Sequence, residues 1–143
     1  MRQVERSAIV PFSAEAMFDL VADVESYPQF LPGCSGARVV SRDGNRVVGS
    51  VALAQGPLKM EFTTCNELAR PRRISMELQD GPFSHLHGSW NFAPLGEAGC
   101  RVSLSLQFGF ESRLIDLAMG PPFEAIRNKL VDAFVNRARA VNA

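Results

Sequence analysis

The sequence predicts an α+β domain in which a strongly curved antiparallel sheet of about seven strands wraps around one long C-terminal helix. Apolar and polar residues alternate from Gly36 to Phe110, which is the pattern of half-buried strands. Only short turn signals separate the alternating stretches, so successive strands are predicted to pair antiparallel. Apolar residues then recur at helical spacing from Ser112 to Val141. The length favours a single domain, residues 1–143, because a second would leave neither half a sizeable core.

The N-terminal part predicts a strand followed by two short helices. The strand covers Gln3–Val10, where apolar residues alternate with polar ones, and Pro11 ends it. Ser13 is a good N-cap for the first helix, because its hydroxyl can accept a bond from a free backbone N–H. Asp23 is predicted to cap the second helical segment, over Val24–Phe30.

Six more strands follow from the alternation. They are predicted at Val39–Arg42, Arg46–Ala54, Leu58–Leu68, Arg73–Gln79, Leu86–Ala93 and Arg101–Phe110. The last strand is the clearest, because every second residue from Val102 to Phe110 is apolar and the residues between are serine, glutamine or glycine. One face of the sheet is therefore predicted to be apolar and the other solvated.

The closing helix is predicted to carry an apolar stripe that continues to Val141. The run Gly120-Pro121-Pro122 is predicted to kink or interrupt it, because proline removes a helical hydrogen bond. A curved sheet and a long helix need not touch everywhere. They can therefore enclose an elongated apolar cavity between them.

Charge and cysteine usage exclude several classes of function. The 15 basic and 15 acidic residues give a formal net charge of zero, which disfavours DNA binding driven by bulk electrostatics but leaves room for a local basic patch. The three cysteines are far apart and show no metal-binding spacing, so reduced thiols in the cytoplasm are the simplest interpretation. His85 and His87 could share a strand face, but a third metal ligand is missing nearby.

Catalytic motifs are also missing. The sequence has no G-x-S-x-G elbow, phosphate-binding loop, dinucleotide glycine motif or Cys-x-x-Cys pair. We therefore expect a protein that is not an enzyme and that has no catalytic residues, no metal and no cofactor. Cys34 is better explained as a small buried thiol than as a nucleophile.

Two aromatic segments are candidates for ligand or partner contacts. Two prolines and a glycine fix the path of the segment from Asp23 to Cys34, which displays Tyr27, Phe30 and Leu31. These side chains could plug one end of the sheet, form the mouth of a cavity, or contact a partner. In the second segment, from Asp80 to Phe92, Trp90 could pack in the core or line the cavity.

The closing helix carries a small basic excess. Its basic residues outnumber its acidic ones: the basic residues are Arg127, Lys129, Arg137 and Arg139, and the acidic residues are Glu124 and Asp132. A solvated helix face explains these charges, and the alternative is attraction to anionic lipid head groups or to ribosomal RNA.

These segments together resemble the signatures of the bacterial RatA and coenzyme Q-binding proteins, a family of the START-like, or polyketide cyclase/dehydrase, superfamily. The first signature is Tyr27–Cys34, and the second joins Asp80–Phe83 to Gly88–Phe92. The resemblance implies a helix-grip fold with a hydrophobic tunnel for ubiquinone or another isoprenoid lipid, serving respiration and quinone synthesis. For RatA it implies a toxin-like protein that hinders association of the ribosomal subunits. Cys65 departs from the pattern, since relatives often carry a basic residue there.

The main functional hypothesis is a non-catalytic carrier that binds ubiquinone or a related isoprenoid lipid as its ligand. The side chains predicted to form the tunnel and its mouth are Tyr27, Phe30, Leu31, Phe62, Phe83, Trp90, Phe108, Met119, Phe123, Ile126 and Leu130. The alternative is a RatA-type toxin that binds a ribosomal subunit through Arg127, Arg137 and Arg139. A polyketide cyclase or dehydratase ranks last. A cytoplasmic location is expected, with peripheral contact at the inner membrane as a further possibility.

Overall fold

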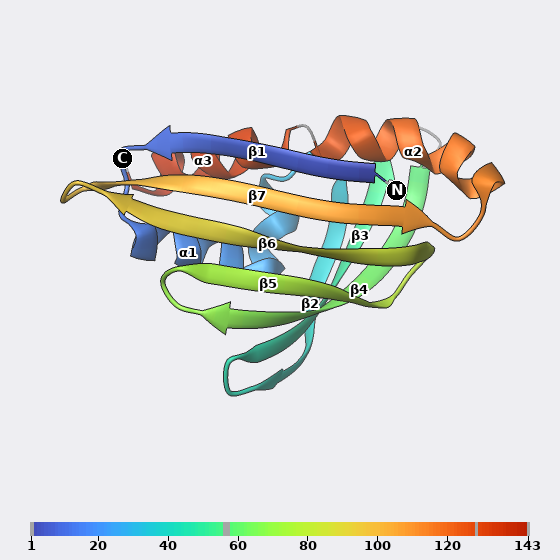
Figure 1. Cartoon of the computed structure of the whole chain (residues 1–143), viewed down its shortest axis with the longest axis horizontal. Coiled ribbons are helices and arrows are strands. Elements are labelled where there is room, and N and C mark those ends of the chain that lie inside the picture. Colours follow the sequence, from blue (N-terminus) through green and yellow to red (C-terminus); the bar gives the residue numbers. More distant parts are fainter. Residues whose placement is uncertain (1, 56–57, 128, 143) are drawn as a thin grey trace.

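Every strand predicted from the alternation is present in the computed structural model, which describes residues 2–55, 58–127 and 129–142 (Figure 1). The strands are β1 (Arg2–Val10), β2 (Cys34–Asp43), β3 (Arg46–Gln55), β4 (Leu58–Ala69), β5 (Arg73–Asp80), β6 (Phe83–Leu95) and β7 (Gly99–Phe110). They form one antiparallel sheet in the order β1-β7-β6-β5-β4-β3-β2. The α+β class and the single antiparallel meander are confirmed.

Two strands begin at least three residues earlier than predicted, and irregular pairing explains both. β2 begins at Cys34 and not at Val39, and its pairing with β3 shifts register twice, after Cys34 and after Val39. β6 begins at Phe83 and not at Leu86, and its pairing with β7 shifts between Phe83 and His85. A bulge inserts an extra residue and breaks the alternation from which a strand is recognised.

Two short helices follow β1, as predicted. In α1 (Ala14–Ala22), the Ser13 hydroxyl accepts a bond from the Ala16 N–H at 3.1 Å, which is the expected cap. The second segment, η1 (Val24–Gln29), is a 3₁₀ helix. The Asp23 carboxylate accepts a bond from the Ser26 hydroxyl there, so it does not cap a backbone N–H as predicted.

The predicted closing helix is two helices, α2 (Arg113–Arg127) and α3 (Leu130–Val141). The interruption falls between Arg127 and Leu130 and not at Gly120-Pro121-Pro122, where a kink or an interruption was predicted. α2 runs through both prolines. Their missing N–H groups would have served the carbonyls of Leu117 and Ala118, which are exposed residues where water can take that role.

Arg2 fastens α2 to the edge of the sheet. Its Nε and Nη2 donate to the Asp116 carboxylate at 2.8 and 3.0 Å, and its Nη1 pairs with Glu124. The guanidinium lies against Gly120, where a Cβ would stand 2.5 Å from Nη2, so glycine makes the close approach possible. The Arg2 charge also lowers the pKa of Asp116.

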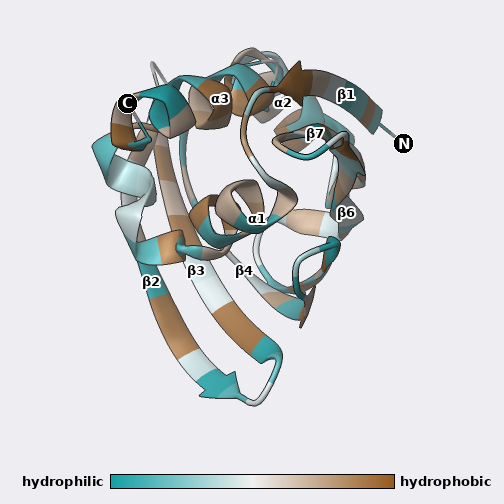
Figure 2. Cartoon of the chain, turned by 90° about the vertical axis from the view of Figure 1, so that its left-hand side faces the viewer, coloured by the Kyte–Doolittle hydropathy of each residue, from teal (hydrophilic) through white to brown (hydrophobic). Residues whose placement is uncertain are grey.

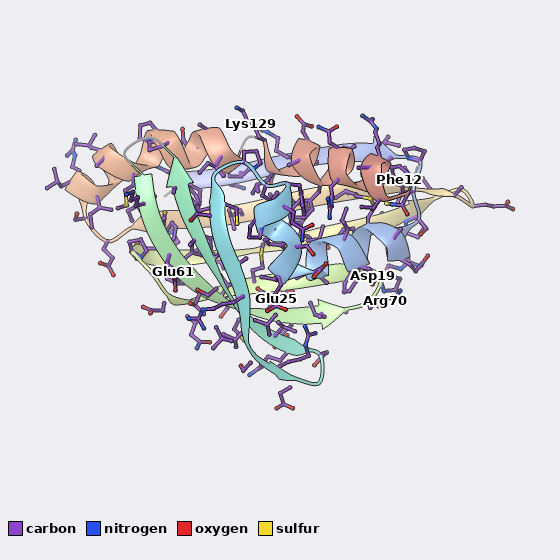
Figure 3. All side chains as sticks on the ribbon, turned by 180° about the vertical axis from the view of Figure 1, so that it is seen from behind. Phe12, Asp19, Glu25, Glu61, Arg70 and Lys129 are labelled. Carbon is purple, nitrogen blue, oxygen red and sulfur yellow. The ribbon has the colours of Figure 1, made fainter. Side chains whose placement is uncertain are left out.

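The sheet curls around α1, while α2 and α3 cover its open side (Figure 2). Arg70, after β4, holds α1 from outside through paired bonds of 2.8 and 2.9 Å to Asp19 (Figure 3). The core has two hydrophobic clusters. In the first cluster, α1 and α3 pack around Phe18, Phe92 and Phe134. In the second, α2 packs on the strands around Phe83, Phe108 and Phe123. Among the described residues, no helix has both the length and the apolar character needed to cross a membrane.

Candidate functional site

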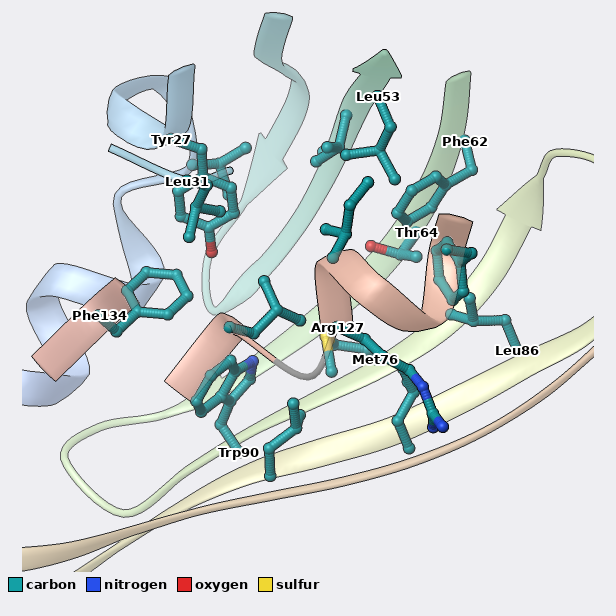
Figure 4. A pocket seen from close by; sticks show the side chains of 18 of the residues that line it. Tyr27, Leu31, Leu53, Phe62, Thr64, Met76, Leu86, Trp90, Arg127 and Phe134 are labelled. Atoms are coloured by element: carbon teal, nitrogen blue, oxygen red, sulfur yellow. The ribbon is translucent and has the colours of Figure 1, made fainter. Parts of the chain in front are cut away.

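An apolar cavity of about 130 Å³ lies between the concave face of the sheet and the helical layer (Figure 4). Members of both hydrophobic clusters line the cavity. It therefore lies where the two clusters meet and where their side chains leave a space unfilled. Most of the predicted tunnel residues lie in its wall: Tyr27, Leu31, Phe62, Trp90, Phe123, Ile126 and Leu130.

Four predicted tunnel residues lie elsewhere. Phe83 and Phe108 are buried behind Phe123, with ring centroids 5.5 and 4.9 Å from its ring, so they support the wall without forming it. Met119 packs against the same cluster. Phe30 packs edge-on against Phe134 at 5.2 Å and lines a separate hollow on the surface beside α3.

Tyr27 offers the cavity its ring and not its hydroxyl. The hydroxyl donates to the Val21 carbonyl, which anchors η1 to the end of α1. The ring packs against Phe134, with centroids 5.4 Å apart. Desolvation raises the pKa of Tyr27 well above its ordinary value, so the phenol stays neutral.

Two polar wall residues were missed in the sequence. Thr64 and Asn66, on β4, are 9% and 8% exposed and both line the cavity. The Thr64 hydroxyl donates to the Asn66 side-chain oxygen at 2.9 Å. A signal was available, because Thr64 and Asn66 share the alternation phase of Met60 and Phe62 and so had to point inward with them.

Further wall residues were also missed, and all are apolar residues or glycine from the strands, from η1 and the turn after it, and from α3: Val24, Pro32, Gly49, Val51, Leu53, Met76, Leu86, Leu104, Leu106 and Phe134. Their types gave no signal beyond burial, because an aliphatic side chain in a core and one in a cavity wall follow the same alternation.

Arg127 does not lie on the solvated face where it was predicted. Its side chain is only 12% exposed and forms part of the cavity wall. Nη1 donates to the Gln3 carbonyl at 3.2 Å, Nη2 lies 3.5 Å from Glu124, and Cζ stands 5.5 Å from the centroid of the Phe108 ring. Burial lowers the pKa of the guanidinium. This arginine therefore joins α2 to the sheet.

The other two predicted partner residues remain on α3. Arg137 is half-buried, donates to the Gln29 side chain at 2.8 Å and stands 5.2 Å from the centroid of the Phe30 ring. Arg139 is exposed, as is Lys129 at the start of α3, which projects outward from the helical layer (Figure 3).

The two histidines lie beside polar side chains, and the three cysteines are free thiols. His85 and His87 have ring centroids 6.3 Å apart and contact Ser84 and Gln107. Within residues 2–55, 58–127 and 129–142, no three His, Cys, Asp or Glu side chains are grouped to hold a metal ion. Burial raises the pKa of Cys34, which disfavours the reactive thiolate.

The described cavity wall holds few ionisable groups. Tyr27 and Arg127 are its ionisable residues in the described structure, and both are already tied to backbone carbonyls. General acid–base catalysis needs a group that can exchange a proton near neutral pH. Neither a phenol with a raised pKa nor a guanidinium meets that need.

Comparisons with known proteins agree with this architecture. The model of the family described as polyketide cyclase / dehydrase and lipid transport matches residues 10–135. The chain is 48% identical to the ribosome association toxin RatA of Vibrio cholerae, over 99% of this chain and 98% of that protein. It is 26% identical to the mitochondrial coenzyme Q-binding protein COQ10 homolog B of Xenopus laevis, over 95% of this chain and 57% of that protein.

Solved structures show the same fold at low sequence identity. The structure of TTHA0849 from Thermus thermophilus superimposes with a TM-score of 0.85 at 21% identity, covering 99% of this chain and all of that one. The Zhui aromatase/cyclase of a Streptomyces species gives a TM-score of 0.82 at 19% identity, covering 96% of this chain and 93% of that one. At these identities the likeness concerns the fold alone.

Proposed function

The chain belongs to the polyketide cyclase/dehydrase and lipid transport family, and from this premise we propose that it associates with the ribosome, as the name of its RatA relatives states. The observation that carries the proposal is the 48% identity with the Vibrio protein over almost the full length of both chains. The ubiquinone hypothesis depends on a relative that is only 26% identical. Ribosome association is therefore the better supported of the two hypotheses.

The exposed cations of α3 are the proposed contact with ribosomal RNA. A protein of zero net charge needs a local basic surface to bind a polyanion. Lys129 and Arg137 line the Phe30 hollow together with the acidic Asp132, and Arg139 adds an exposed cation on the same helix. Arg127, which the sequence placed in this surface, belongs to the cavity wall and is left out of the proposed contact.

Reversing two of these charges should weaken the effect on ribosomes. Overexpression of the wild-type protein is expected to move whole ribosomes into free subunits in a sucrose gradient. The double variant Lys129→Glu, Arg139→Glu should need at least about tenfold more protein for the same shift, because both phosphate contacts become repulsive. Both residues are exposed, so folding should be unaffected.

The matched control is Arg72→Glu, Arg73→Glu, which changes the net charge equally at the exposed turn between β4 and β5. This control should act like the wild type. An unchanged gradient with wild-type protein would reject ribosome association. Equal losses in the two double variants would reject α3 as the contact.

A second candidate function, which we also propose, is the binding of an apolar ligand in the cavity. The supporting observation is the unfilled apolar space of about 130 Å³. An engineered protein cavity of about 150 Å³ binds benzene, so the space here suits one ring-sized group. An isoprenoid chain attached to such a ring would have to extend beyond the cavity.

Extraction of protein purified from its native host tests this second function. Mass spectrometry of the organic extract is expected to find one class of apolar compound that is reduced in a Val51→Phe variant, because Val51 lines the cavity and a phenyl ring there would take up part of the space. An empty extract from wild-type protein, together with no binding of ring-sized probes, would reject the function.

A further inference from the structure

We infer that Asn66 makes the cavity a selective site for a neutral, ring-sized ligand that carries a hydrogen-bond acceptor such as a carbonyl oxygen; the inference rests on the second function proposed above. Asn66 is 8% exposed and lies in a wall that is otherwise mostly hydrocarbon. A buried amide gains nothing from apolar packing and loses its bonds to water. Its hydrogen-bonding groups therefore decide which ligand is accepted.

The orientation of the Asn66 amide leaves its nitrogen free. Thr64 Oγ1 donates its single proton to Asn66 Oδ1 at 2.9 Å. Because the carboxamide is planar, holding the oxygen also fixes the direction of Nδ2. Among the described residues, Nδ2 makes no hydrogen bond. The cavity therefore contains a positioned donor that only an acceptor on a ligand, or a water, can satisfy.

The charges around the cavity favour a neutral acceptor over a carboxylate. Arg127 supplies the one formal charge among the described wall residues; its Nη1 donates to the Gln3 carbonyl and its Nη2 lies 3.5 Å from Glu124, while its buried Nε has no hydrogen-bond partner. A carboxylate moved into this space would lose its hydration and would have to share the Arg127 cation with Glu124. A ketone, ester or ether oxygen can accept from Nδ2 at a much smaller desolvation penalty.

Two ring-sized probes that differ in one carbonyl test the inference. Acetophenone and ethylbenzene have nearly the same shape, but only acetophenone can accept a hydrogen bond. Their dissociation constants can be followed through Trp90, which lines the cavity and is the single tryptophan of the chain. The ratio of the two constants is compared between variants, so that the different water affinities of the probes cancel.

Asn66→Leu is expected to shift this ratio against acetophenone by at least about tenfold, because the variant keeps the side-chain size and loses the donor. Val51→Ile is the matched control on the neighbouring strand. It changes the volume of the wall and not its polarity, so the ratio should stay as in the wild type.

A second measurement uses the wild-type protein alone and does not depend on the folding of a variant. The infrared carbonyl stretch of bound acetophenone should lie below its value in hydrocarbon solvent, because a hydrogen bond weakens the carbonyl bond. A hydrocarbon-like stretch, or a ratio unchanged in Asn66→Leu, would overturn the inference. Failure of both probes to bind the wild type would instead reject ligand binding by the cavity as a whole.

Discussion

Gly88→Ala is expected to destabilise the protein by at least about 3 kcal/mol, the upper range for overpacking a well-packed interior. Gly88 lies on β6 opposite Leu106 of β7. A Cβ at this position would stand 2.2 Å from the Ser105 carbonyl oxygen and 2.9 Å from the Leu106 Cα. Both are backbone atoms inside the sheet, so relief requires β6 and β7 to move apart.

Gly36→Ala provides the matched control for this prediction. Gly36 also lies in a strand, but a Cβ there would meet only the Ala52 Cβ at 3.8 Å, an ordinary contact. The change should alter the free energy of unfolding by less than about 1 kcal/mol. Urea unfolding followed by Trp90 fluorescence measures both variants. Equal effects at the two glycines would show that β6 and β7 can separate at little cost.

Most of the strands could be predicted because they bury one face beneath the helices. Alternation then records burial directly, as in β7, where Val102, Leu104, Leu106, Phe108 and Phe110 are all buried. The starts of β2 and β6 were misplaced because register shifts break the alternation there. α2 is not interrupted at Gly120-Pro121-Pro122, because the carbonyls that lose their helical partners there belong to exposed residues.

The cavity wall was harder to predict than the sheet. Alternation identifies the residues that face inward, but it does not show which of them are covered by a side chain of a helix. Leu104, Leu106 and Phe108 all point inward from β7, yet only the two leucines line the cavity. Phe123 of α2 covers Phe108, with ring centroids 4.9 Å apart. That contact depends on where α2 crosses the strands, which the spacing of apolar residues does not specify.

The two proposals, ribosome association and ligand binding, would use different faces of α3, so they are compatible with each other. Leu130 and Phe134 line the cavity on the inner face, while Lys129 and Arg139 are exposed. Arg127 illustrates why helical spacing alone could not separate these faces. It belongs to α2, and the chain changes helix between it and Leu130. In a single continuous helix, the fixed rotation per residue would have set the angle between the side chains of Arg127 and Leu130.

Phe134→Ala is expected to lower the free energy of unfolding by about 3–5 kcal/mol, the usual loss for a fully buried phenylalanine. Phe134 is 1% exposed, and its ring centroid lies 5.4 Å from Tyr27, 5.2 Å from Phe30 and 5.2 Å from Trp90. One side chain of α3 thus holds η1 and β6 together at the cavity. Urea unfolding should show the loss, and Trp90 emission should move to longer wavelength as water reaches the ring. Leu117→Ala, at a position that is 67% exposed on α2, should change stability by less than about 0.5 kcal/mol. A comparable loss in both variants would mean that burial of Phe134 is not what joins these elements.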